Sequence, residues 1–223
     1  MEIAILGGTG DIGEGLAVRF AADTDHDVTI GSRTAEKARD RADAYEERLA
    51  DHGVDRSIDG TGNADAAADA DIVILAIPPH YVADTVESLD DEGVLAEQLL
   101  VSPAVGMQGD EDGLHYNPPG IGSVTELVAA RAPDDIAVAG AYHNLAADRL
   151  ANLEADLDVD TLVVADDPDV RERVIALSAE LEGVRPLAAG PLSNAAEVES
   201  VTPLVINIAR YNDDMHDVGV TFH

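Results

Sequence analysis

Apolar residues in the first two thirds of the chain gather in short continuous runs, and stretches with helical spacing separate these runs. Such runs are typical of parallel strands that are buried on both faces. The strand candidates are residues 3–6, 27–30, 71–77, 98–102 and 136–140. The helix candidates are residues 14–21, 35–51, 81–88 and 124–132. Strands that alternate with helices predict an α/β fold with a doubly wound, right-handed parallel sheet.

The pattern changes after residue 140. The later candidates are short strands at residues 161–165 and 184–187 and helices at residues 168–182 and 194–212. We therefore expect residues 1–140 to form the main domain and residues 141–223 to form a small C-terminal extension of the sheet with a final helix. Earlier in the chain, residues 59–63 are expected to form a polar turn before a short alanine-rich helix.

A glycine-rich turn follows the first strand. Gly8, Gly10 and Gly13 form a Gly-x-Gly-x-x-Gly pattern between that strand and the first helix. This spacing lets backbone N–H groups and the N-terminus of the helix face a pyrophosphate. Because the motif lies in the required strand and helix context, it predicts a Rossmann-type dinucleotide site.

The end of the second strand predicts which dinucleotide binds. A site selective for NAD normally has Asp or Glu about 20 residues beyond the glycines, where it binds the ribose 2′-hydroxyl. This chain has Ser32 and Arg33 instead, with Lys37 one helical turn further on. A hydroxyl and two cations can bind a 2′-phosphate, which a carboxylate would repel. NADP is therefore expected in preference to NAD.

The chain is strongly acidic, with 45 acidic and 13 basic residues and a formal net charge of −32. This excess excludes generic attraction to nucleic acid or to anionic membranes. Because 46% of the residues are hydrophobic, a folded protein adapted to concentrated salt is favoured over a disordered chain. The chain has no cysteine, no metal-binding histidine spacing and no signal or membrane segment, which predicts a cytoplasmic protein without a metal.

Two common catalytic arrangements are absent. Short-chain dehydrogenases pair a tyrosine with a lysine four residues later, and β-hydroxyacid dehydrogenases use a lysine in a helical C-terminal domain. Lys37 is the only lysine in the chain, so neither arrangement is possible. Only His143 follows a strand in an apolar segment, where it could face a nicotinamide or merely order its loop. A dinucleotide site with little acid–base chemistry suits direct hydride transfer between two cofactors, with no catalytic side chain.

The motifs together resemble those of the archaeal F420-dependent NADP reductases. The resemblance rests on the glycine turn, on Ser32, Arg33 and Lys37, and on later segments in the same order along nearly the whole chain. These segments are Val101-Ser102-Pro103, Ala141-x-His143, Arg149-x-Ala151-Asn152-Leu153, Arg185 to Asn194 and Val198 to Ile208. Composition points to a haloarchaeal member.

The resemblance implies reversible hydride transfer between C5 of reduced coenzyme F420, a deazaflavin, and C4 of the nicotinamide of NADP. It places the pyrophosphate at Gly8, Thr9, Gly10, Asp11 and Ile12, and the 2′-phosphate at Ser32, Arg33 and Lys37. It places the ribose and nicotinamide at Ile77, Tyr81, Val105 and Ala147. The deazaflavin pocket would lie near His143, Pro203, Leu204 and Asn207. Asp11 departs from the uncharged residue that a pyrophosphate would favour, so its side chain is expected to point away.

Two other functions stay open at this point. One is an NADPH-dependent flavin-reducing or metal-reducing module, which the absence of a membrane segment disfavours. The other is a non-catalytic protein that senses NADP. The apolar final helix also makes a homodimer the expected assembly, while nucleic acid and membranes are not expected as partners.

Overall fold

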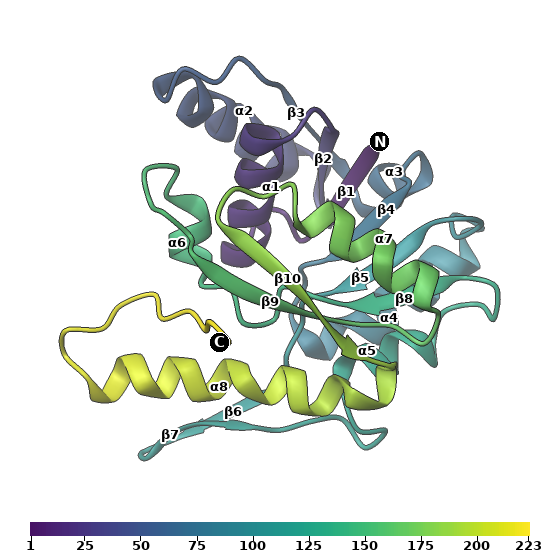
Figure 1. Cartoon of the computed structure of the whole chain (residues 1–223). Coiled ribbons are helices and arrows are strands. Elements are labelled where there is room, and N and C mark those ends of the chain that lie inside the picture. The colour runs from purple at the N-terminus through teal and green to yellow at the C-terminus, as the bar shows by residue number, and fades with distance from the viewer.

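A single eight-stranded sheet runs through the computed structural model, which describes residues 1–223, and helices cover both of its faces (Figure 1). The strand order is β10-β9-β8-β5-β4-β1-β2-β3. The strands are β1 (Glu2–Leu6), β2 (Asp27–Ser32), β3 (Ile58–Gly62), β4 (Ile72–Leu75), β5 (Leu99–Ser102), β8 (Ala137–Gly140), β9 (Val159–Val164) and β10 (Val184–Gly190). All neighbours are parallel except β8 and β9, which pair antiparallel only at Gly140 and Val164. The predicted doubly wound sheet is confirmed.

The helices divide between the two faces because side chains alternate along each strand. They are α1 (Asp11–Asp23), α2 (Ala35–Asp51), α3 (Asn63–Ala68), α4 (Val82–Asp91), α5 (Val124–Ala129), α6 (Ala147–Ala151), α7 (Pro168–Ser178) and α8 (Ala195–Tyr211), with short 3₁₀ turns η1 (Pro79–Tyr81) and η2 (Leu192–Asn194). Ile3 and Ile5 of β1 pack in one core with α1, α2 and α7. Ala4 and Leu6 pack in the other core with α3, α4 and α5. None of these helices is long and apolar enough to cross a membrane.

The prediction of a polar turn at residues 59–63 was wrong, because most of this segment belongs to β3 at the edge of the sheet. An edge strand has a neighbour on one side only and stays partly exposed, so it can be polar. Its glycines are also common in turns, which made the segment look like one. Packing against α2 requires glycine at position 60, because a Cβ there would lie 2.5 Å from the carbonyl carbon and oxygen of Ala38. The glycine therefore lets α2 lie directly on the strand.

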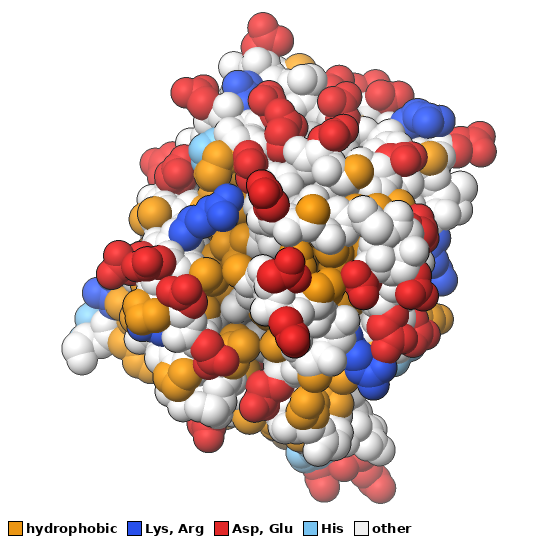
Figure 2. All heavy atoms as spheres, turned by 90° about the vertical axis from the view of Figure 1, so that its right-hand side faces the viewer, with side chains coloured by type: hydrophobic (Ala, Val, Ile, Leu, Met, Phe, Trp, Pro, Cys, Tyr) orange, Lys and Arg blue, Asp and Glu red, His pale blue; other side chains and the backbone are white.

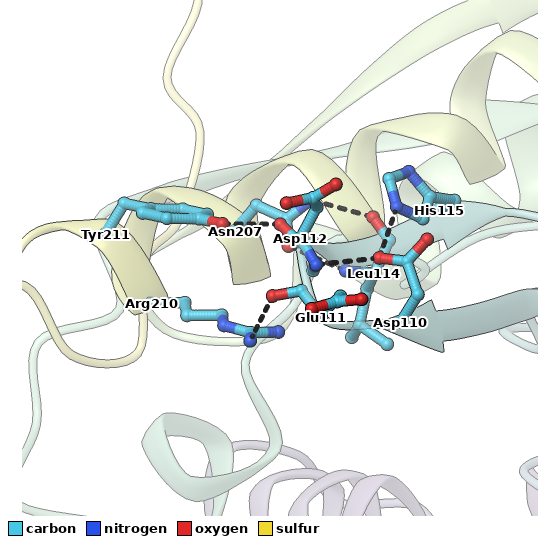
Figure 3. A network of polar contacts seen from close by, with 9 residues as sticks. Asp110, Glu111, Asp112, Leu114, His115, Asn207, Arg210 and Tyr211 are labelled. Atoms are coloured by element: carbon cyan, nitrogen blue, oxygen red, sulfur yellow. Dashed lines mark hydrogen bonds and ion pairs between the residues drawn. The ribbon is translucent and has the colours of Figure 1, made fainter.

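A β-hairpin that the sequence analysis did not predict lies against α8, below the main sheet in Figure 1. It consists of β6 (Met107–Asp110) and β7 (Gly113–Tyr116). The side chain of Asn207 accepts the N–H of Leu114 at 2.9 Å and donates to its carbonyl at 2.7 Å. Tyr211 and Arg210 donate to carbonyls in the hairpin turn, as Figure 3 shows. The hairpin and α8 therefore form one layer.

The C-terminal tail completes the sheet beside β9. The first half of β9 has no partner in β8, and the Asp160 N–H donates instead to the carbonyl of Val220 at 2.8 Å. The Asp160 carboxylate accepts hydrogen bonds from the N–H of Phe222 and from Nε and Nη2 of Arg185, each at 2.6 to 2.7 Å. Arg185 also donates to the Phe222 carbonyl. This buried carboxylate fixes the tail in place.

Acidic side chains cover much of the surface. Figure 2 shows them spread over one whole face, with few basic side chains among them. Their mutual repulsion is reduced when salt is concentrated.

Candidate functional site

A cavity of about 740 Å³ lies at the carboxyl ends of the central strands. This is where open α/β sheets bind their ligands. Its walls come from the turns after β1, β4, β5 and β8, from Met107 of the hairpin, and from α8 and the tail. The wall residues are 10–12, 76–79, 103–105, 107 and 142–148, with Thr202, Val205, Ile206, Ala209, Asp217 and Val218. Most of them are apolar, so the cavity suits flat ring systems.

The glycine turn is shaped by close backbone approaches. Gly7 has a φ of +79°, a conformation that favours glycine. At Gly13, a Cβ would lie 2.4 Å from the Gly7 carbonyl oxygen, so any side chain would push α1 away from the turn. The Tyr45 hydroxyl donates to the carbonyl of Gly8 at 2.9 Å and braces the turn from α2. The first backbone N–H groups of α1 therefore stay open to a phosphate.

A second cluster forms where β2 ends. Ser32 is buried, while Arg33 and Lys37 are exposed. The Arg33 guanidinium lies over the ring of Tyr81, 5.4 Å from its centroid. Neither Arg33 nor Lys37 forms an ion pair, whereas Arg48 in the same region pairs with Glu14 at 2.6 Å. Two unpaired cations in a chain of net charge −32 suit an anionic ligand.

The structure brings part of the predicted site together on the cavity wall. Seven predicted residues line the cavity: Gly10, Asp11, Ile12, Ile77, Val105, His143 and Ala147. Gly8 and Thr9 lie in the adjoining turn, outside the wall itself. Tyr81 is 44% exposed and lies with Arg33. The predicted residues thus fall into a cavity group and a group of exposed cations beside it.

The three residues predicted on α8 do not line the cavity. Leu204 is 57% exposed, Pro203 is buried but does not line the cavity, and Asn207 is held by Leu114 of the hairpin (Figure 3). The helix instead presents another face, formed by Thr202, Val205, Ile206 and Ala209. Thr202 lies three and four residues before Val205 and Ile206, and Ala209 lies four and three residues after them, so the four positions share one side of a helix. The cavity thus meets α8 on a different side from the three predicted residues, whose contact with the deazaflavin stays a prediction.

His143 lies at the cavity wall and is only 4% exposed. Burial lowers its pKa to about 3, so the ring is neutral at ordinary pH. Its Nε2 lies 3.3 Å from the hydroxyl oxygen of Thr125, and its carbonyl accepts the hydroxyl of Thr202 at 2.7 Å. A neutral ring that is held by Thr125 and Thr202 can position a ligand, but it is a poor proton donor.

The charges on the cavity wall are all negative. Asp11, Asp148 and Asp217 line it, and it contains no lysine or arginine. No group of three or more acidic or histidine side chains is arranged to hold a metal ion. The wall therefore offers an apolar surface and a neutral imidazole, without a paired general acid and base.

Glu199 is a polar residue of this region that the sequence analysis missed. It is fully buried on α8 and accepts hydrogen bonds from residues at the start of α5. One acidic residue among 45 gives no sequence signal of burial. Only its position on the inner side of an apolar helix could have indicated it.

Comparison with known proteins gives a consistent result. Residues 2–106 match the family model described as "NADP oxidoreductase coenzyme F420-dependent". The F420-dependent NADP reductase of Methanocaldococcus jannaschii is 37% identical over 211 residues, which cover 93% of this chain and 92% of the relative. The enzyme of the same description from Methanothermobacter marburgensis is 35% identical over the same shares. Among solved structures, a candidate F420-dependent NADP reductase from Arthrobacter sp. FB24 has a TM-score of 0.76 and 24% identity, covering 95% of this chain and 94% of that chain. This last likeness concerns the fold alone.

Proposed function

Since the chain belongs to the F420-dependent NADP reductase family, we propose that it transfers a hydride directly and reversibly between C5 of reduced F420 and C4 of the nicotinamide of NADP. The protein is an oxidoreductase whose cofactors are NADP and coenzyme F420. The observation that carries the proposal is the mostly apolar cavity between the glycine turn and α8, which lacks a paired acid and base. In such a site the cofactors supply the reactive atoms, and the protein holds the rings together and excludes water.

The two parts of the chain would bind different cofactors. Residues 1–140 would hold NADP, with its pyrophosphate at the glycine turn and its 2′-phosphate at Ser32, Arg33 and Lys37. Gly10 lines the cavity, and a Cβ there would meet only the Gly7 carbonyl oxygen, at 3.4 Å, so the turn is open to a close backbone approach by phosphate. Residues 141–223 would complete the deazaflavin pocket through His143 and the inner face of α8.

A direct assay tests this function. The protein is mixed with NADPH and oxidised F420 in concentrated salt, and the deazaflavin absorbance is followed. Loss of the F420 absorbance at the rate of NADPH oxidation is expected. Loss of FAD absorbance without loss of F420 absorbance would favour the flavin-reducing alternative. Bound NADPH with neither change would favour a sensor.

A homodimer is the assembly that we propose. Leu204, Ile208 and Tyr211 expose apolar surface along the outer side of α8, at 37 to 63% exposure. Adjacent exposed apolar side chains on one helix are typical of an interaction surface. Sedimentation in concentrated salt should give twice the mass of the chain, and Leu204→Glu should return it to the monomer.

A further inference from the structure

Glu199 is a buried carboxyl group that hydride transfer does not require. It reaches from α8 to the start of α5 and to the end of β7, and four hydrogen-bond partners surround it. These are the Tyr116 hydroxyl at 2.9 Å, the Val124 N–H at 3.1 Å, the Thr125 N–H at 2.9 Å and the Thr125 hydroxyl at 3.0 Å. Burial raises its pKa above the ordinary value, and the hydrogen bonds act in the opposite direction. The two backbone N–H groups can only donate, one to each carboxyl oxygen, and they hold the group as an acceptor.

The Thr125 hydroxyl joins this carboxylate to the cavity wall. Its oxygen lies 3.0 Å from Glu199 and 3.3 Å from Nε2 of His143. A hydroxyl has one hydrogen, and Glu199 can only accept, so this hydrogen goes to the carboxylate. The Thr125 oxygen is then left to accept a hydrogen from Nε2 of His143. The neutral imidazole is thereby fixed with its proton on Nε2.

This assignment leaves a lone pair on the other ring nitrogen. Nδ1 of His143 is buried and has no hydrogen-bond partner in the protein. The next residue repeats the arrangement, since the Asn144 amide donates to the Asp160 carbonyl at 2.6 Å and its Oδ1 has no partner. Both residues line the cavity. Two adjacent acceptors beside the cavity are thus enclosed by the protein and left without donors, which is costly unless a bound ligand reaches them.

We propose that Glu199, acting through Thr125, is a positioning residue that holds His143 in its Nε2–H tautomer. His143 and Asn144 then receive N–H groups of a bound cofactor. The donors are the carboxamide NH₂ of the nicotinamide or the ring N–H of the deazaflavin, which share this chemistry. The inference rests on the proposed function for the identity of the cofactor, while the tautomer itself does not depend on it.

The tautomer can be observed in the full chain without any cofactor. In ¹⁵N NMR of the histidine rings, His143 is assigned by its disappearance in His143→Gln. Its Nε2 should appear as a protonated nitrogen and its Nδ1 as an unprotonated nitrogen. A proton on Nδ1 would overturn the proposal, whatever the enzyme reduces.

Two variants of Thr125 separate positioning from packing. Thr125→Val keeps the shape and removes the hydroxyl, so the His143 ring should become a mixture of tautomers. The Michaelis constant of the cofactor that donates to Nδ1 should rise about fivefold to tenfold, as expected for one lost hydrogen bond, with little change in kcat. Thr125→Ser retains the hydroxyl and should restore both readouts. A higher Michaelis constant for NADPH alone would identify the nicotinamide as the donor to Nδ1. A higher Michaelis constant for F420 alone would identify the deazaflavin.

Two variants around Glu199 complete the test. Glu199→Gln removes the charge that attracts the Thr125 hydrogen and should also mix the tautomers. Tyr116→Phe removes a different donor from the same carboxylate and should leave the His143 tautomer and both Michaelis constants unchanged. Unchanged Michaelis constants in Thr125→Val would contradict the proposal, as would equal effects of Tyr116→Phe and Thr125→Val. If Thr125→Val does not fold, the NMR spectra of wild type and Thr125→Ser decide. If wild type fails to reduce F420, the proposed function falls and the tautomer measurement still stands.

Discussion

The cluster at the end of β2 and the cavity beside it carry charged side chains of opposite sign. The first exposes two unpaired cations, Arg33 and Lys37, and the second has three carboxylates and a neutral histidine but no cation. A phosphate that takes no part in the reaction could thus be recognised by positive charge, while the reacting rings would meet a mostly apolar wall that has no cation. Binding energy from a remote group can then position the reacting group. The difference suggests that cofactor choice and hydride transfer can be altered separately.

Reversing the charge in the cation cluster should have the largest effect. We expect Arg33→Glu to raise the Michaelis constant for NADPH about a hundredfold, because it removes a charge-assisted hydrogen bond and adds repulsion. The constant for NADH should change little. Arg39→Glu, at an exposed position of the following helix α2, serves as the control. Steady-state kinetics with both nucleotides measure this, and an unchanged NADPH/NADH preference would refute the 2′-phosphate assignment.

The neutral state of His143 should make the free energy of unfolding fall as the pH is lowered. The pKa of His143 is lowered by burial from 6.5 to about 3, so the unfolded chain binds a proton below pH 6.5 that the folded chain does not. His143 should therefore reduce the free energy of unfolding by about 1.4 kcal/mol for each pH unit below 6.5. The measurement compares chemical denaturation of wild type and His143→Gln from pH 7 to pH 5 in the same salt. Parallel pH profiles would show that the ring is protonated in the folded protein.

The smallest expected effect concerns the carboxylates of the cavity. Asp217 lines the cavity with a φ of +51°, which asparagine also tolerates. Asp217→Asn should lower the Michaelis constants of the anionic cofactors about threefold at 0.1 M salt, since repulsion is weakly screened there. At 1 M salt, where the screening length is about 3 Å, the difference should disappear. Asp213→Asn, exposed in the same tail and outside the cavity, should show no salt-dependent difference.

The sequence predicted the parts of the fold that have a clear period or motif. The buried strands are continuous apolar runs, and the glycine turn has a fixed spacing, so both were expected before the structure. The β3 strand was missed because Asp59 and Gly60 are typical turn residues and the strand lies at an edge. The hairpin was also missed, although Asp112-Gly113 is a known hairpin turn signal.

The inner face of α8 and the role of Glu199 could not be predicted in the same way. Leu204 and Ile208 are apolar and exposed, whereas Val205 and Ile206 are apolar and line the cavity. Apolar residues on more than one side leave the rotation of a helix undefined until its neighbours are known. The contacts of Glu199 join positions 74 and 75 residues apart, which no local pattern records.

The clamp between Asp160, Arg185 and the tail bears on how the protein should be handled. Phe222 is held by Asp160 and Arg185, and Asp217 and Val218 of the same tail form part of the cavity wall. An affinity tag fused after His223 would therefore pull on a segment that shapes the site. Met1 precedes β1 at the amino end of the sheet, opposite the cavity. A tag at the N-terminus is the choice that leaves the site intact during purification and kinetics.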